Sequence, residues 1–342
     1  MCNDNTVCND NTVCNDNTVC NERSHRVTNG TSAGSTQVAR PSVSVLDGIG
    51  GTPLVELEEG IFTKLEFLNP SGSIKARIAK YMIERAEQEG VLKPGMTIVE
   101  ASSGNTGNAM SMVAAVKGYS MLVVMPEGMS SARVAISRSF GAEVREVGYF
   151  HVNEALQLAR DLGTQPGYWA PSQFDSEWNV DENRTWLGPE ILAQLPSGRL
   201  PDALVMGVGT GGTLIGVGQA FRAVNPAVEL VAVEPDESRT ILCGEIGHHM
   251  IEGISDGFVP GIFARHRQMV DQTMPVSSTE ALDEMHRLAR TYGMLVGPSS
   301  GAHMLAARRL KSERPELRTI VTLLCDEGEK YFDEHFGLGA AS

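Results

Sequence analysis

The chain has 342 residues, of which 42% are hydrophobic, and it carries 42 Asp and Glu against 28 Lys and Arg, for a formal net charge of -14. A chain of this length can bury a core without disulfide bonds, and the acidic balance argues against sequence-independent binding to nucleic acid or to an anionic membrane. No apolar run is long enough for a membrane span and no secretory signal is visible, so we expect a cytoplasmic protein.

Residues 1–40 are predicted to be a disordered tail. They begin with a tandem CNDNTV repeat that contains Cys2, Cys8, Cys14 and Cys20 and has almost no apolar residues to pack. The spacing of these cysteines, without interleaved histidines, is not the spacing of a zinc site. We therefore expect neither a metal site nor a functional role in this tail.

From about residue 42 onward, apolar runs typical of buried strands alternate with segments of helical period. In chain order, strands are predicted over 96–101, 119–128, 142–147, 202–209, 228–235 and 319–326, and helices over 75–89, 108–118, 131–141, 153–162, 213–224 and 279–293. This alternation, with short connections, implies an α/β fold with mostly parallel sheets covered by helices. Because Pro and Gly recur over 163–200, we place a domain boundary there, between a smaller α/β domain over 41–170 and a larger one over 171–335, with a tail over 336–342.

Lys75 follows the Pro-Ser-Gly-Ser turn at 70–73 and stands where an amphipathic helix is predicted to begin. Most lysines in a first helical turn are solvated. A lysine held in a pocket can instead act as a nucleophile through its deprotonated amine. The residues around Lys75 do not decide between the two.

A turn rich in small residues follows the strand predicted over 96–101. It reads SSGNTG and is followed directly by a helix, so its free backbone N–H groups and the hydroxyls of Ser102, Ser103 and Thr106 could bind an anion. A helix N-cap would explain any one of these residues. It explains five consecutive small polar and glycine residues poorly, and we favour a ligand-binding loop.

A second glycine-bearing turn, GVGTGGT over 207–213, also lies between a strand and a helix. Gly207, Gly209 and Gly212 match G-x-G-x-x-G, and Glu234 ends the next strand, which is the pattern of a dinucleotide-binding site. A smaller phosphate ligand would fit the same backbone amides equally well. A nicotinamide-dependent oxidoreductase therefore stays open as an alternative at this point.

A third turn, GPSSGA over 297–302, would by itself be read as a capped helix start. All three turns are predicted at the carboxyl ends of strands, where open α/β sheets bind ligands. A ligand that contacts all three turns and one lysine needs a phosphate, an aldehyde and other polar atoms. Pyridoxal phosphate has these groups, with a phenolic oxygen and a ring nitrogen in addition.

Seven stretches of the body occur in the order typical of one family: GGTPLVEL, KLEFLNPSGSIKARIA, EASSGNTGN, SQFDS, GVGTGGT, EGISDGFVP and GPSSGA. On these motifs the body, from about residue 42 to 335, resembles the cysteine synthase/cystathionine β-synthase family of pyridoxal-phosphate enzymes of fold type II. The resemblance implies two three-layer αβα domains, as in the tryptophan synthase β subunit, with the first residues of the smaller domain crossing to the larger one. It also implies a homodimer.

The resemblance assigns a role to each motif residue. Lys75 is similar to the lysine that forms the internal Schiff base and later acts as the base at the substrate Cα. Asn105 is similar to the partner of the cofactor's phenolic oxygen, and Ser299 to the partner of its ring nitrogen. The phosphate loop would consist of Gly209, Thr210, Gly211, Gly212 and Thr213. The site for the substrate carboxylate would consist of Ser102, Ser103, Thr106 and Gln173. No metal is implied.

The implied activity is β-substitution on an O-activated L-serine, O-acetylserine or O-phosphoserine, with sulfide or a thiol, giving L-cysteine or a related β-substituted alanine. Trp178, Trp186, Leu187 and Asp256 depart from the pattern of the sulfide-using enzymes, either through drift or because the substrate differs. The alternatives are a 2,3-diaminopropionate-type synthase with an amine donor, a cystathionine β-synthase, and a catalytically silent binding or regulatory homologue.

Overall fold

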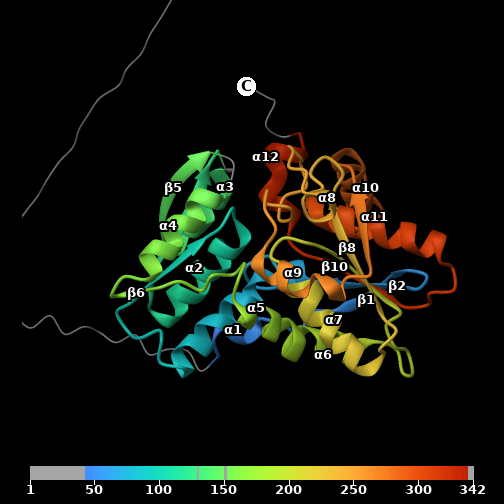
Figure 1. The fold of residues 1–342 in the computed structure, drawn as a ribbon, viewed down its shortest axis with the longest axis horizontal. Helices are drawn as coiled ribbons and strands as arrows, with labels where there is room; N and C mark the ends of the chain where they lie inside the picture. The colour runs from blue at the N-terminus through green and yellow to red at the C-terminus, as the bar shows by residue number, and fades with distance from the viewer. Residues whose placement is uncertain (1–42, 129–130, 150–151, 338–342) are drawn as a thin grey trace, which may run out of the picture. The chain divides into compact units, whose positions relative to one another are not determined.

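Two β-sheets organise the body (Figure 1). The computed structural model describes residues 43–128, 131–149 and 152–337. The six-stranded sheet has the order β1 (Leu54–Glu58), β2 (Ile61–Leu65), β10 (Ile320–Leu324), β7 (Ala203–Gly207), β8 (Glu229–Pro235), β9 (Gln272–Val276). The four-stranded sheet has the order β5 (Glu143–Tyr149), β4 (Ser120–Glu127), β3 (Thr97–Ala101), β6 (Tyr168–Trp169). Only β1 and β2 pair antiparallel among these strands, which confirms the prediction of mostly parallel sheets.

The helices that follow the strands cover the sheets. They are α1 (Lys75–Gln88), α2 (Asn105–Lys117), α3 (Ser131–Ser139), α4 (Asn153–Gly163), α5 (Glu177–Glu182), α6 (Gly188–Gln194), α7 (Gly212–Val224), α8 (Thr240–Cys243), α9 (Gly261–His266), α10 (Ser278–Tyr292), α11 (Pro298–Glu313) and α12 (Phe332–His335). A π-helical turn, Asn183–Leu187, joins α5 to α6. No helix in the described ranges is long and apolar enough to cross a membrane.

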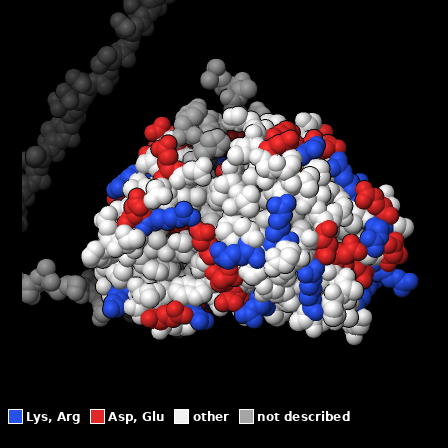
Figure 2. All heavy atoms as spheres, in the orientation of Figure 1, with Lys and Arg blue, Asp and Glu red and all other residues white. Residues whose placement is uncertain are grey.

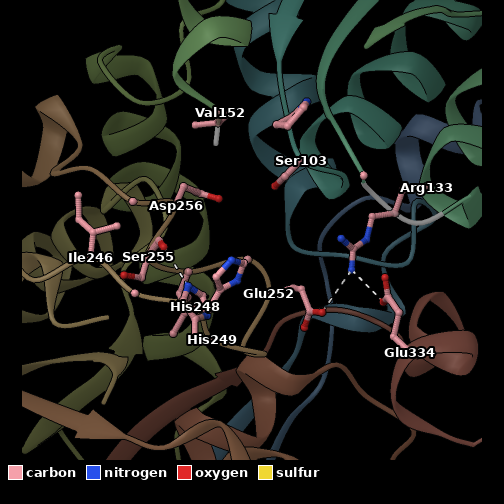
Figure 3. A pocket seen from close by; sticks show the side chains of 16 residues that line it. Ser103, Arg133, Val152, Ile246, His248, His249, Glu252, Ser255, Asp256 and Glu334 are labelled. Atoms are coloured by element: carbon pink, nitrogen blue, oxygen red, sulfur yellow. Dashed lines mark hydrogen bonds and ion pairs between the residues drawn. The ribbon is translucent and has the colours of Figure 1, made fainter. Parts of the chain in front are cut away.

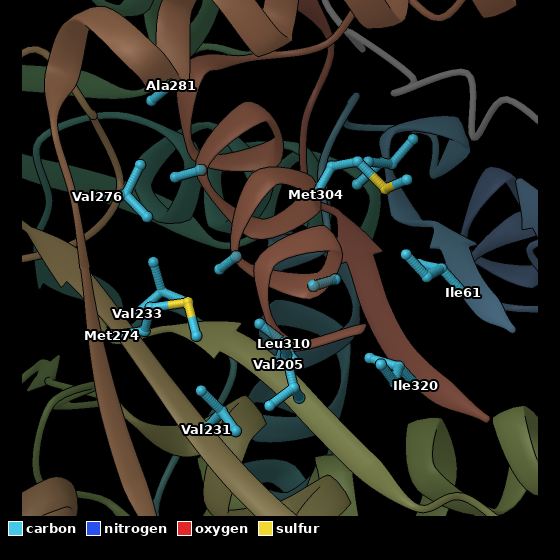
Figure 4. Packing of buried hydrophobic residues seen from close by; sticks show 14 of the residues in the cluster. Ile61, Val205, Val231, Val233, Met274, Val276, Ala281, Met304, Leu310 and Ile320 are labelled. Atoms are coloured by element: carbon cyan, nitrogen blue, oxygen red, sulfur yellow. The ribbon is translucent and has the colours of Figure 1, made fainter. Parts of the chain in front are cut away.

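Each sheet is buried on both faces. In the six-stranded sheet, Val205 and Val231 pack against α10 and α11 on one face (Figure 4), whereas the neighbouring Leu204 and Leu230 pack against α6 and α7 on the other. Side chains alternate between faces along a strand, so strands that are apolar throughout need a helical layer on each side. The four-stranded sheet has the same arrangement, with α1 and α2 on one face and α4 on the other. These layers confirm the α/β fold class.

Some elements were not predicted. The sequence analysis missed the β1–β2 hairpin and the strands β6 and β9, and it started the second helix at 108 although α2 begins at Asn105. Strand β2 pairs in parallel with β10, so this early part of the chain belongs to the sheet built mainly from residues after 200. Val43–Ser342 form one compact unit, and the boundary near residue 170 stays a prediction. The cysteine repeat and residues 338–342 lie outside the described residues.

Acidic and basic side chains are interspersed on the face shown in Figure 2 and do not gather into a basic patch there.

Candidate functional site

The loops that follow β3 and β7 meet the start of α1 at two small adjoining cavities, of about 50 and 30 Å³. Both cavities are lined by Lys75, Asn105, Gly209 and Thr210. The first also contains Ser102, Ser103, Thr106 and Gln173, and the second Gly211, Thr213 and Ser299. The structure thus brings together all of the predicted site residues except Gly212, whose N–H donates to Thr210 Oγ1 at 3.2 Å.

Lys75 is the first residue of α1 and is partly buried. Its Nζ has no hydrogen-bond or ion-pair partner within the described part of the chain, although it lines both cavities. The turn before it is held closely, because Gly72 has a φ of +65° and a Cβ there would lie 2.2 Å from the carboxylate of Glu327. The backbone N–H of Ile74 donates to the carbonyl of Cys325 at 2.8 Å. The amine of Lys75 is therefore held at the site without being paired.

In the loop after β3, most hydroxyls make bonds within the protein. Ser102 Oγ accepts from the backbone N–H groups of Gly104 and Gly107, each at 3.0 Å, so it does cap the start of α2. Thr106 Oγ1 donates to Gln173 Oε1 at 2.6 Å. Ser103 lines the cavity instead (Figure 3). The loop therefore fits both hypotheses made from its sequence, a helix cap and a ligand-binding loop. Ser102 caps the helix, and Ser103 faces the cavity.

The loop after β7 forms a cradle at the N-terminus of α7. Gly211 is the N-cap residue, with a φ of +85°, and as a glycine it has no side chain that could cap the helix. A Cβ at Gly209 would lie 2.5 Å from the carbonyl oxygen of Gly253, so only glycine fits between these backbones. Thr210 Oγ1 is held in place by Asn179 Nδ2 at 3.0 Å. The backbone N–H groups at a helix N-terminus next to small residues are suited to bind a phosphate.

Ser299 lies in the first turn of α11, is 5% exposed, and its hydroxyl has no partner among the described residues. One turn further along, buried His303 accepts from the N–H of Gly207 through Nε2 at 2.7 Å, and its Nδ1 lies 2.9 Å from the carbonyl of Leu323. Burial lowers the pKa of His303 to about 4, so the ring is neutral at pH 7. His303 supports the strand end that leads into the cradle.

Sequence reasoning missed several residues of the site because they come from distant segments. Asn105, predicted to contact the cofactor, donates to Asp326 Oδ2 at 2.6 Å and accepts from Lys330 Nζ at 3.0 Å. Neither partner was singled out from the sequence. The Cys-Asp-Glu-Gly-Glu-Lys segment over 325–330, which begins within the last predicted strand, was the available signal, since it lies at the carboxyl end of a central strand.

A larger cavity of about 340 Å³ adjoins the Lys75 cavities (Figure 3). It shares Ser103, Arg133, Glu252, Gly253 and Asp256 with the first of them. Its wall includes the segment 246–257, which the sequence analysis did not assign to the site. Arg133 crosses it, with its guanidinium 3.3 Å from Glu334 Oε2. The cavity is thus lined by ionisable groups of both signs.

Three of the unusual residues do not contact the site. Leu187 is fully buried in the core with residues of α6 and α7. Trp186 lies beside Arg77, whose guanidinium carbon is 5.2 Å from the centroid of the tryptophan ring. Trp178 packs in the same way beside Arg85. Neither these two tryptophans nor Leu187 line the three cavities described above. Their location favours packing over substrate choice, whereas Asp256 does line the site.

A dinucleotide-binding site at the second glycine turn would need Glu234 to be free to bind the ligand, and the structure shows this carboxylate bonded within the protein. Glu234 is buried, and its carboxylate accepts from the backbone N–H groups of Ile241 at 2.8 Å and Leu242 at 3.1 Å. A carboxylate that caps a helix in this way is not free to bind a ribose hydroxyl. The nicotinamide alternative is therefore not supported by the residues around the loop.

Known proteins are similar to this chain in sequence and in fold. The family of pyridoxal-phosphate dependent enzymes matches residues 45–326. The chain belongs to this family. A cysteine synthase of Staphylococcus aureus is 40% identical over 300 residues, which cover 85% of this chain and 96% of that protein. The resemblance to cysteine synthases predicted from the motifs is thereby confirmed.

Solved structures with a similar fold agree with this assignment. The crystal structure of an O-ureido-L-serine synthase has a TM-score of 0.82 at 36% identity and covers 87% of this chain and 96% of its own. An O-acetylserine dependent cystathionine β-synthase from Helicobacter pylori has a TM-score of 0.81 at 31% identity and covers 87% of this chain and all of its own. Both enzymes are named for chemistry on a serine derivative.

The site fits the cofactor of the pyridoxal-phosphate family. The cradle at Gly209 and Gly211 excludes side chains and presents a helix N-terminus for a phosphate. The unpaired amine of Lys75 suits an aldehyde, and the hydroxyl of Ser299 suits a ring nitrogen, each from the same cavity. Nothing in the donor set conflicts with pyridoxal phosphate.

Proposed function

We propose that this protein catalyses pyridoxal-phosphate-dependent β-substitution on an O-activated L-serine with sulfide or a thiol, giving L-cysteine or a related β-substituted alanine. The observation that carries the proposal is the amine of Lys75, unpaired and placed between the cradle of α7 and the loop 102–106. The similarity to cysteine synthase and to serine-derivative synthases supports the same reaction class.

The roles of the residues follow from their positions. We assign Lys75 Nζ to hold the cofactor and to take the proton from the substrate Cα. The phosphate would bind to Gly209, Thr210, Gly211, Gly212 and Thr213. The backbone amides of the loop after β3, with Ser103, would bind the substrate carboxylate, and Ser102, Thr106 and Gln173 hold that loop in shape.

Bound pyridoxal phosphate would supply an aldehyde for amines and a conjugated ring that withdraws electrons from Cα. The neutral hydroxyl of Ser299, as the partner of the ring nitrogen, would leave that nitrogen less firmly protonated than a carboxylate would. We infer that this choice of residue favours loss of a leaving group from Cβ over transamination. Asn105 would donate to the phenolic oxygen.

The test is an activity matrix of O-acetyl-L-serine and O-phospho-L-serine against sulfide, small thiols and amines, with the cofactor-loaded protein. Products are identified by mass spectrometry, and the visible spectrum is recorded after each serine is added alone. We expect a spectral change with at least one of the serines and a β-substituted alanine as product. A loaded protein that shows no spectral change with either serine would favour the silent binding homologue instead.

One observation favours a second candidate, in which the nucleophile is an amine or an amino acid. The adjoining cavity of about 340 Å³ is much larger than sulfide needs, and Glu252, Asp256 and Arg133 in its wall could pair with a charged substrate. The amine column of the same matrix tests this candidate. We further propose a homodimer in the cytoplasm, and light scattering after gel filtration tests the dimer.

A further inference from the structure

The side-chain amide of Asn105 is held between two buried groups of opposite charge. Its Nδ2 donates to Asp326 Oδ2 at 2.6 Å, and its Oδ1 accepts from Lys330 Nζ at 3.0 Å. Asp326 is 2% exposed and Lys330 is 4% exposed. Both partners come from the segment after β10, more than 200 residues from Asn105 in the sequence.

This pairing determines which way the amide points. A carboxylate only accepts hydrogen bonds and an ammonium only donates them. If the amide were rotated by half a turn, its oxygen would face the carboxylate of Asp326 and its NH₂ would face the ammonium of Lys330. Two hydrogen bonds to charged groups would become two repulsive contacts in a buried site. The electrostatics therefore allow one orientation.

The two charged residues are themselves held in place. Lys330 Nζ also donates to the carbonyls of Ser71 at 3.0 Å and Gly72 at 3.1 Å, in the turn that precedes Lys75. The hydroxyl of Tyr331 donates to Asp326 Oδ2 at 2.5 Å. Lys330 thus connects the lysine-bearing turn to Asn105, and Asp326 Oδ2 accepts from both Asn105 and Tyr331.

We propose that Lys330 and Asp326 are positioning residues, which hold the Asn105 amide with its second Nδ2 hydrogen toward the cofactor site. That hydrogen has no partner in the described ranges, and Asn105 lines both cavities with Lys75. The inference rests on the proposed function, because it concerns the donor that faces the phenolic oxygen. It assigns a role to two residues outside the loops that were identified from the sequence.

The test measures two quantities in the wild type and in each variant. They are the visible absorption maximum of the cofactor-loaded protein and the Kd for pyridoxal phosphate added to cofactor-free protein. Asn105→Ala provides the reference for a lost donor. We expect Lys330→Met and Asp326→Asn to move the absorption maximum in the direction of Asn105→Ala and to raise Kd by about tenfold, as the loss of one hydrogen bond to a charged group implies. Lys330→Arg keeps a cationic donor and should retain the wild-type absorption maximum.

Two further variants separate positioning from general destabilisation. Lys311→Met removes a lysine that also donates to two backbone carbonyls but lies outside the site, and it should change neither readout. Tyr331→Phe removes only one donor to Asp326 and should give a smaller shift in the same direction, which decides the question if Lys330→Met does not fold. The inference is overturned, and the proposed function is not, if Asn105→Ala shifts the absorption maximum while Lys330→Met and Asp326→Asn keep the wild-type spectrum. Failure of the wild type to bind pyridoxal phosphate would overturn the proposed function.

Discussion

Single residues of this site differ in how they are bonded, and Lys75 stands out because its amine has no partner in the described structure. The lysines nearest to it in the sequence, Lys64 and Lys80, each have a bonding partner. Lys80 Nζ donates to the carbonyl of Leu46 at 3.0 Å, and Lys64 Nζ contacts Glu190 at 2.6 Å. An amine that is free to react must first be free of stronger partners. The geometry therefore singles out Lys75 among these three.

Replacing Lys75 with Ala should abolish β-substitution, with a loss of at least about a hundredfold in kcat, because the Cα proton loses its acceptor. Borohydride reduction followed by peptide mass spectrometry should find the cofactor mass on the peptide that contains Lys75 in the wild type and not in the variant. Lys80→Ala is the matched control and should keep the label. A label on another lysine in the wild type would contradict the assignment.

His303 gives a prediction about pH. Its folded-state pKa is lowered from an ordinary value of 6.5 to about 4, because burial disfavours the charged ring. Protonation would also remove the acceptor that Nε2 offers to the N–H of Gly207. A lowered pKa means that the contribution of His303 to stability is complete above pH 6.5 and is lost as the pH falls from 6.5 toward 4. The total loss from this group is on the order of 3 kcal/mol.

Denaturant unfolding at pH 7.5 and at pH 5 would measure this dependence. His303→Gln keeps a donor and an acceptor but does not titrate, so its free energy of unfolding should fall less than that of the wild type between the two pH values. Equal slopes in both proteins would show that His303 is not the group responsible.

At the scale of elements, the site depends on where strands end and helices begin. Helices α2 and α7 each start a short loop after a parallel strand, α2 after β3 of the four-stranded sheet and α7 after β7 of the six-stranded sheet. Residues from both helix starts line the cavities that contain Lys75. The glycines of the loop after β7 make that geometry possible, because backbone from 253 packs against Gly209. The helix termini, rather than charged side chains, would then bind the phosphate.

Gly209→Ala should weaken cofactor binding by about tenfold or more, because its Cβ would lie 2.5 Å from the carbonyl oxygen of Gly253 and the loop would have to move. Titration of cofactor-free protein with pyridoxal phosphate measures the effect. Gly48→Ala is the control, since a Cβ there meets its nearest neighbour, Pro70, at an ordinary 3.6 Å. An unchanged Kd in Gly209→Ala would mean that the loop adapts or that the phosphate binds elsewhere.

At the scale of the whole molecule, a buried ionic network joins strand β2, helix α1 and helix α6. Glu190 lies 2.6 Å from Lys64 Nζ and 2.7 Å from Arg77 Nη2, and Arg77 also contacts buried Glu66 at 2.7 Å. Burial alone would raise the pKa of Glu190, but Arg77 and Lys64 outweigh it and lower this pKa to about 2. The network therefore holds β2 and α1 against α6, which lies more than 100 residues further along the chain.

Glu190→Ala should reduce the free energy of unfolding by about 3–5 kcal/mol, because it leaves two buried cations with fewer partners. Glu89→Ala breaks the exposed pair with Arg85 and should cost less than about 1 kcal/mol. Urea denaturation of both variants at pH 7 gives the comparison. A similar loss in the two variants would show that the buried network contributes no more than a surface pair.

The sequence by itself determined the α/β class, the order of most strands and helices, and the loops around Lys75, because glycine spacing, apolar period and small polar turns are local properties. The roles predicted for Asn105 and Ser299 came from the resemblance of their motifs to the cysteine synthase family, because the turn at 297–302 would by itself be read as a helix start. The sequence did not identify Asp326 and Lys330, which lie 221 and 225 residues from Asn105, nor the network of Glu190 with Lys64 and Arg77. A hydrogen bond requires its two atoms to lie about 3 Å apart, and which distant residues meet that condition was decided only when the strands paired and the helices packed.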